Sequence, residues 1–137
     1  MALLVWTRTA AGAELDIAVQ EVRNDRGHVL VAVCTEDTFL QADCPHTGRA
    51  AAAVGEVVVT VRDIPPGTYA VQAFHDENDN AEFDRNLLGV PLEGIGFSND
   101  APMDFGPPHF EEAAIAIAGG GHHGIRFRMR YLDGGDG

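Results

Sequence analysis

The sequence is poor in basic residues and has no long hydrophobic run. Nine Lys or Arg stand against 21 Asp or Glu, which gives a net charge of −12 and a pI near 4.6. Nucleic acids and anionic membrane surfaces are both bound through basic patches. No apolar stretch approaches the length of a membrane span. Composition therefore excludes nucleic acid as a partner and excludes insertion into a membrane.

Catalytic motifs are missing as well. The chain has no Gly-x-Ser-x-Gly elbow, no His-Glu-x-x-His pair and no glycine-rich phosphate loop. Ser98 is the single serine, and a nucleophilic role would require a base such as His75 or His109 within hydrogen-bond reach. A role in capping the turn at Asn99 is the simpler interpretation. The sequence predicts that the protein is not an enzyme, and a hydrolase is the least favoured function.

The sequence contains two cysteines, Cys34 and Cys44. They lack Cys-x-x-Cys spacing, so neither a redox motif nor a structural zinc site is indicated. A local disulfide is plausible and would contribute about 2–3 kcal/mol by closing a short loop. The alternative is two reduced cysteines, one of them buried.

The N-terminus points to export. Met1 to Trp6 is apolar, and Ala11-Gly12-Ala13 has the small-x-small form of a signal-peptidase site. Residues 1–13 are therefore interpreted as the remnant of a signal peptide or as a flexible tail. We expect one domain over residues 14–132 and a flexible tail over 133–137.

Period-two alternation dominates the expected domain and predicts strands. The apolar positions of these strands are Leu15, Ile17 and Val19; Val29, Val31 and Val33; Val57, Val59 and Val61; Tyr69, Val71 and Ala73; and Ile125, Phe127, Met129 and Tyr131. The polar turn Asn24 to Gly27 predicts a hairpin between the first two runs. Pro65-Pro66-Gly67 predicts a tight turn with glycine free to adopt a positive φ. Short strands joined by such turns predict an all-β, antiparallel β-sandwich.

Other segments are less regular. Residues 87–110 are rich in proline and glycine and predict one long irregular loop packed on the sandwich. Ala113 to Ala118 reads as a short strand, although a helix beginning at Glu111 is an alternative. Arg49 to Ala53 is a weak helix candidate. Arginines 126, 128 and 130 share one face of the last strand, where acidic residues of the neighbouring strand are expected to pair with them.

The acidic segment after the fourth run resembles part of a calcium-binding loop. Asp76, Asn78, Asn80 and Asp84 occupy positions one, three, five and nine of an EF-hand-type loop, and the carbonyl of Glu82 falls at position seven. Position six is Ala81 and position twelve is Leu87, so the EF-hand is incomplete. A turn in which these side chains bond their own backbone is the alternative. Calcium prefers about six to eight oxygens, so Glu93, Asn99 or Asp100 would complete the site.

Four ordered motifs carry a resemblance to a known family. They are Pro65-Pro66-Gly67-Thr68-Tyr69, His75-Asp76-Glu77-Asn78-Asp79-Asn80, Leu88 to Asn99, and Pro107 to Ala113. Over residues 13 to 131 the chain resembles the bacterial family called domain of unknown function 2141. The resemblance implies an exported domain with a transthyretin-like or immunoglobulin-like sandwich and no established activity. Ala81 departs from a glycine common in the family, and Leu92 from a frequent basic residue.

The predicted function is that of a secreted or periplasmic binding or accessory module with a structural calcium ion. An envelope protein, a carbohydrate or a small apolar ligand are the partners left open. An apolar ligand would bind in a pocket lined by Phe97, Phe105 and Phe110. A metal-free structural domain is the further alternative. A histidine metal site is disfavoured, because the adjacent His122 and His123 point in different directions.

Overall fold

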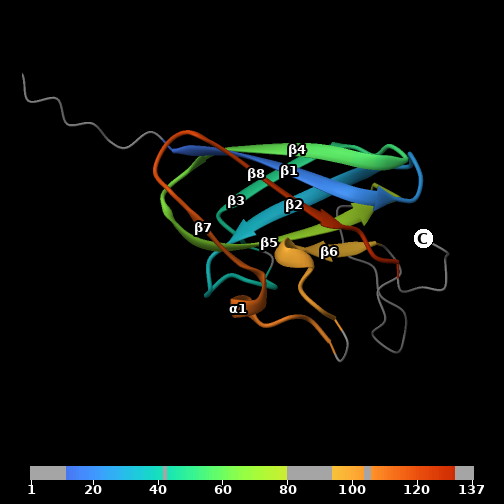
Figure 1. Ribbon diagram of the computed structural model, residues 1–137. Coiled ribbons are helices and arrows are strands. Elements are labelled where there is room, and N and C mark those ends of the chain that lie inside the picture. The colour runs from blue at the N-terminus through green and yellow to red at the C-terminus, as the bar shows by residue number, and fades with distance from the viewer. Residues whose placement is uncertain (1–11, 42, 80–93, 104–105, 132–137) are drawn as a thin grey trace, which may run out of the picture.

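Two β-sheets packed face to face form the molecule (Figure 1). The computed structural model describes residues 12–41, 43–79, 94–103 and 106–131. The first sheet has the order β4 (Gly55–Ile64), β1 (Ala13–Val22), β8 (His122–Arg128). The second has the order β3 (His46–Ala51), β2 (His28–Cys34), β5 (Gly67–Asp76), β6 (Ile95–Phe97), and β7 (Ala114–Ile117) also pairs with β5. The predicted all-β sandwich is confirmed.

Alternating apolar residues of both sheets meet between them and form the core. Leu15, Ile17 and Val19 of β1 are fully buried, while their neighbours on β1 are partly exposed. Burial of each such side chain contributes about 1.5–3 kcal/mol. A shift by one residue would turn this whole row toward solvent, so the pattern determines which face of each strand is buried. The pattern does not determine which strands are neighbours in a sheet.

The predicted hairpin between the first two strands is wrong for that reason. β1 pairs with β4 and β8, whereas β2 pairs with β3 and β5 in the opposite sheet. The turn between them crosses from one sheet to the other. Gly27 lies in this turn with a φ of +67°, and a Cβ there would lie 1.8 Å from the carbonyl oxygen of Asp76. The turn is therefore packed directly on the end of β5.

Four local expectations change, wholly or in part, in the structure. Residues around Arg49 form β3, because the edge of β2 supplies hydrogen-bond partners that outweigh local helix propensity. The segment predicted to be an irregular loop contains β6 and the 3-10 turn η1 (Ser98–Asp100). Both expectations for the next segment are met in part, since the one-turn helix α1 (Phe110–Ala113) leads directly into β7. Gly67 begins β5 after the predicted proline turn, but without a positive φ.

A disulfide joins Cys34 to Cys44, as predicted. It belongs to a second, smaller apolar cluster on the outer side of the five-stranded sheet. In this cluster the ring of Phe39 packs edge-on against Phe97 at 5.8 Å and against Phe110 at 6.0 Å between centroids. The disulfide thus closes the 34–44 segment over a packed aromatic group.

The arginines of β8 lack the cross-strand partners that the sequence predicted. Arg126 lies beside Ala18 and Arg128 beside Gln20 on β1, so the neighbouring strand offers no acid there. Arg128 instead approaches Asp100 of η1, at 3.8 Å between Nε and Oδ2. Among the described residues, no carboxylate forms an ion pair with Arg126.

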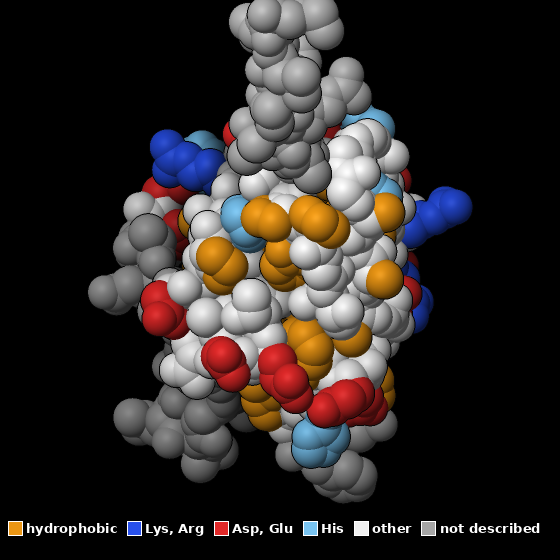
Figure 2. All heavy atoms as spheres, turned by 90° about the vertical axis from the view of Figure 1, so that its left-hand side faces the viewer, with side chains coloured by type: hydrophobic (Ala, Val, Ile, Leu, Met, Phe, Trp, Pro, Cys, Tyr) orange, Lys and Arg blue, Asp and Glu red, His pale blue; other side chains and the backbone are white. Residues whose placement is uncertain are grey.

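One end of the molecule, where β7 lies in Figure 1, shows hydrophobic side chains bordered along one side by Asp and Glu (Figure 2). This distribution agrees with the acidic composition of the chain. Within the described part, no helix has the length and apolar character required to span a bilayer.

Candidate functional site

The end of β5 is the point where the predicted calcium pattern begins. His75 is fully buried and Asp76 is 3% exposed. The backbone N–H of His75 donates to the carbonyl of Gly94 at 2.9 Å. Gly94 has no room for a side chain, because a Cβ would lie 2.5 Å from a ring carbon of Tyr131. Gly94 therefore lies beside the end of β5, next to the residue at which the calcium pattern begins.

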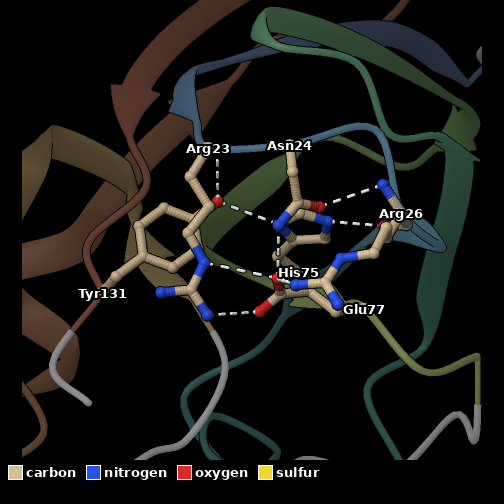
Figure 3. A network of polar contacts seen from close by, with 6 residues as sticks. All are labelled: Arg23, Asn24, Arg26, His75, Glu77 and Tyr131. Atoms are coloured by element: carbon tan, nitrogen blue, oxygen red, sulfur yellow. Dashed lines mark hydrogen bonds and ion pairs between the residues drawn. The ribbon is translucent and has the colours of Figure 1, made fainter. Parts of the chain in front are cut away.

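Glu77, immediately after β5, is bound by the turn between β1 and β2 (Figure 3). Its carboxylate accepts a hydrogen bond from Arg23 Nη2 at 2.6 Å, from Asn24 Nδ2 at 2.6 Å and from Arg26 Nη2 at 3.1 Å. Burial acts to raise the pKa of Glu77. The hydrogen bonds from Arg23 and Asn24 and the charge of Arg23 outweigh burial, so the pKa of Glu77 is lowered. Glu77 is therefore an ionised anchor.

His75 connects the same turn to the end of the chain that follows β8. Its Nε2 lies 2.7 Å from the carbonyl oxygen of Arg26, and its Nδ1 lies 2.9 Å from Tyr131 Oη. A carbonyl oxygen only accepts, so Nε2 carries a proton and donates. With a neutral ring, Nδ1 accepts from the Tyr131 hydroxyl, whose oxygen accepts from the N–H of Arg23 at 3.0 Å. Each polar atom in this chain of contacts then has a suitable partner.

Arg23 completes the arrangement by stacking. Its guanidinium carbon lies 4.3 Å from the centroid of the Tyr131 ring, within range of a cation–π interaction. The network in Figure 3 thus joins three segments that are distant in sequence: the β1–β2 turn, the end of β5 and the residues after β8.

A second acidic residue of the segment is also held. Asp79 Oδ1 lies 2.6 Å from His28 Nδ1 at the start of β2. Glu77 and Asp79 are the positions that the calcium pattern skips. Glu77 and Asp79, which the predicted metal site does not require, therefore bind the segment to the body of the protein.

The predicted calcium ligands are only partly described. Asp76 and Asn78 lie at the base of the segment, whereas Asn80, Glu82, Asp84 and Glu93 lie outside the described residues. Asn99 is described, and it is not brought to Asp76. Its side-chain amide donates to the carbonyls of Glu112 and Ala114 at 3.3 and 3.0 Å.

The position of η1 explains this separation. Ser98 Oγ accepts a hydrogen bond from the N–H of Val71, which is five residues before Asp76 on β5. At about 3.3 Å per residue, this places η1 about 16 Å from the end of the strand. Ser98 is fully buried and its hydroxyl donates to the carbonyl of Ala113, so it holds η1 and α1 against β5.

The predicted apolar ligand site falls in the small aromatic cluster. Phe97 is 2% exposed. The ring of Phe39 packs against both Phe97 and Phe110. Phe105 lies outside the described residues. The structure brings Phe97 and Phe110 together as packed side chains of the second core.

Sequence reasoning missed Arg23, Asn24, Arg26 and Tyr131 as parts of the site. The signal available was a cluster of polar residues in the turn after β1, which was interpreted only as a hairpin turn. The partners of this cluster lie more than fifty residues further along the chain, so local patterns could not reveal them.

The comparison with protein families agrees with this architecture. A family model described as an uncharacterized protein conserved in bacteria (DUF2141) matches residues 17–124. The chain belongs to this family. The matched region of this DUF2141 protein includes the β1–β2 turn and the end of β5, while Tyr131 lies beyond it. No curated protein and no solved structure matches the chain.

Proposed function

We propose that this DUF2141 protein is an exported, non-enzymatic binding or accessory module that presents the segment after β5 from a rigid base. A structural calcium ion, held by Asp76, Asn78, Asn80, Asp84 and the carbonyl of Glu82, organises that segment. The pairing of Glu77 and Asp79 with the body of the protein carries this proposal. Such pairing orients the base of the segment, where Asp76 and Asn78 would supply the first two ligands of the alternate oxygen pattern.

Electrostatics favours a cation at this position. Asp76, Glu77 and Asp79 place three acidic side chains within four positions of the chain, and such a concentration of negative charge attracts cations. The chain carries a net charge of −12, so a divalent ion would also relieve repulsion within an acidic molecule. Asn99 is not part of the proposed ligand set, because its amide is engaged at α1 and β7.

Export to the periplasm or the cell exterior is supported by the disulfide. Disulfides persist in oxidising compartments and are rare in the reducing cytosol. Calcium is abundant outside cells, so a weak site with a Kd of about 10⁻⁴–10⁻³ M would stay filled there.

Calcium titration of the metal-stripped protein tests the proposal. Binding to the folded state alone would stabilise it by about 2.7 kcal/mol at a hundredfold excess over Kd, which raises the melting temperature. Proteolytic cleavage within residues 85–110 should decrease in parallel. Both changes should reverse when a chelator is added.

Two variants locate the effect. Asp76→Asn and Asn78→Ala should each remove the calcium-dependent rise in melting temperature, whereas Asp37→Asn, an exposed carboxylate in the turn after β2, should retain it. The proposal fails if calcium gives neither heat nor a thermal shift up to millimolar concentration, or if both variants respond like the wild type. Either result would favour the alternative function, a structural domain without a metal ion.

A further inference from the structure

A second cluster of metal-ligating side chains lies on the outer face of the three-stranded sheet, away from the calcium pattern. Glu14 and Asp16 are two residues apart on β1 and therefore share one face. β8 runs parallel to β1 and places His122 directly beside Glu14. Strand register thus brings one imidazole and two carboxylates together from positions more than one hundred residues apart.

The imidazole lies between the two carboxylates. His122 Nδ1 is 2.8 Å from Glu14 Oε2, and His122 Nε2 is 2.5 Å from Asp16 Oδ2. One donor atom from each of the three residues lies within 4.8 Å of the other two. Small displacements of these exposed or half-buried side chains would let the three atoms converge on one ion.

Groups outside the trio orient both carboxylates. Thr60 on β4 donates its hydroxyl to Asp16 Oδ1 at 2.6 Å, and Arg62 Nε lies 3.0 Å from Glu14 Oε1. In each case the neighbour engages one carboxylate oxygen, and the other oxygen faces His122. Outer hydrogen bonds of this kind hold metal-ligating carboxylates in position in known metal sites.

We propose that Glu14, Asp16 and His122 form a binding site for a divalent transition metal ion of the zinc type. Imidazole nitrogen with carboxylate oxygens is a donor set suited to such ions, with water filling the open positions. Calcium prefers oxygen ligands alone, so this site differs in chemistry from the one at Asp76.

Charge balance supports a metal ion at this site. Glu14 and Asp16 both face the His122 ring, and their two negative charges attract a cation. An imidazolium between two carboxylates leaves the trio with one negative charge. A divalent ion with neutral imidazole makes the trio neutral. The imidazole nitrogen that binds a metal ion must be unprotonated, so metal and proton compete for His122.

Zinc titration of the full chain by calorimetry at pH 8 tests this inference. We expect a zinc site whose affinity decreases at least tenfold in His122→Gln. His123→Gln is the matched control, because the adjacent ring contacts the carbonyl of Gly120 instead of the carboxylates. Asp16→Asn is a second, nearly isosteric variant and should weaken zinc binding by at least tenfold as well.

Three outcomes would overturn the inference. They are no binding of zinc up to about 0.1 mM, unchanged binding in His122→Gln and Asp16→Asn, and equal loss in the His123→Gln control. The calcium response at Asp76 should persist in His122→Gln, so failure of either site can be recognised independently of the other.

Discussion

At the scale of single residues, Glu77 is the polar group on which the base of the site depends. Its side chain is 10% exposed and its main partner Arg23 is 18% exposed. Charge-assisted hydrogen bonds at such partly buried positions are stronger than ordinary surface ion pairs. Loss of Glu77 would also remove the carboxylate that accepts a hydrogen bond from Arg23 Nη2 at 2.6 Å.

Glu77→Gln should therefore destabilise the protein by about 1–3 kcal/mol at pH 7, measured by urea unfolding. The pKa of Glu77 is lowered by folding, so its contribution is present above the unfolded value near 4.5 and is lost as pH falls through the folded pKa. The difference in unfolding free energy between wild type and variant should consequently decrease below about pH 4.5.

Glu56→Gln is the matched control for this prediction. Glu56 is exposed on β4 and its carboxylate accepts only a long hydrogen bond from Gln20 at 3.3 Å among the described contacts. The change should cost less than about 0.5 kcal/mol. Equal effects of the two substitutions would contradict the anchoring role of Glu77.

At the scale of elements, the contact between β6 and the residues that follow β8 joins the two sheets. Backbone hydrogen bonds connect Ile95 and Arg130 in both directions, at 2.9 and 2.8 Å. Gly96 permits this approach, because a Cβ there would lie 2.7 Å from the carbonyl oxygen of Arg128 and 3.0 Å from the Phe127 ring. The same contact positions Tyr131, and through it His75, at the base of the site.

Gly96→Ala should destabilise the protein by about 1–3 kcal/mol, since backbone and a buried ring must shift to admit the methyl group. Gly124→Ala on β8 is the control, because a Cβ there meets no atom within 4 Å. That substitution should be neutral or slightly stabilising. Thermal unfolding of both variants measures the difference, and a fully tolerated Gly96→Ala would show that the approach of β6 to β8 is not tight.

At the scale of the whole molecule, the excess of negative charge dominates. The net charge is −12, and carboxylates border the apolar side chains at one end (Figure 2). Such an excess destabilises a compact state through mutual repulsion. The ion pairs described above act in the opposite direction, and only the network around Glu77 is substantially buried.

Addition of salt should therefore raise the melting temperature of the metal-free protein. Between 0.01 M and 0.15 M the screening length falls from about 30 Å to about 8 Å, which weakens long-range repulsion more than the close, partly buried pairs. Sodium and potassium chloride should act alike in a thermal scan. A fall in melting temperature would indicate that exposed ion pairs contribute more than repulsion.

Much of the fold was predictable from particular residues. The alternation of Leu15, Ile17 and Val19 correctly indicated a half-buried strand, and Cys34 and Cys44 were close enough in sequence for a local bridge. The arrangement of the predicted site was harder to infer from the sequence. Asp76 ends β5 and Asn78 follows it, whereas Asn99, also predicted as a ligand, lies near the other end of β5.

The sequence by itself determined which face of each strand is buried, because a period of two residues matches the geometry of a strand and the hydrophobic effect acts on that period. Only the tertiary structure decided which strands are neighbours. The parallel pairing of β1 with β8 brought His122 to Glu14, and the crossing after β1 brought Arg23 to Glu77. These contacts depend on how two sheets with interchangeable valine-rich faces pair and stack, and no local pattern encodes that choice.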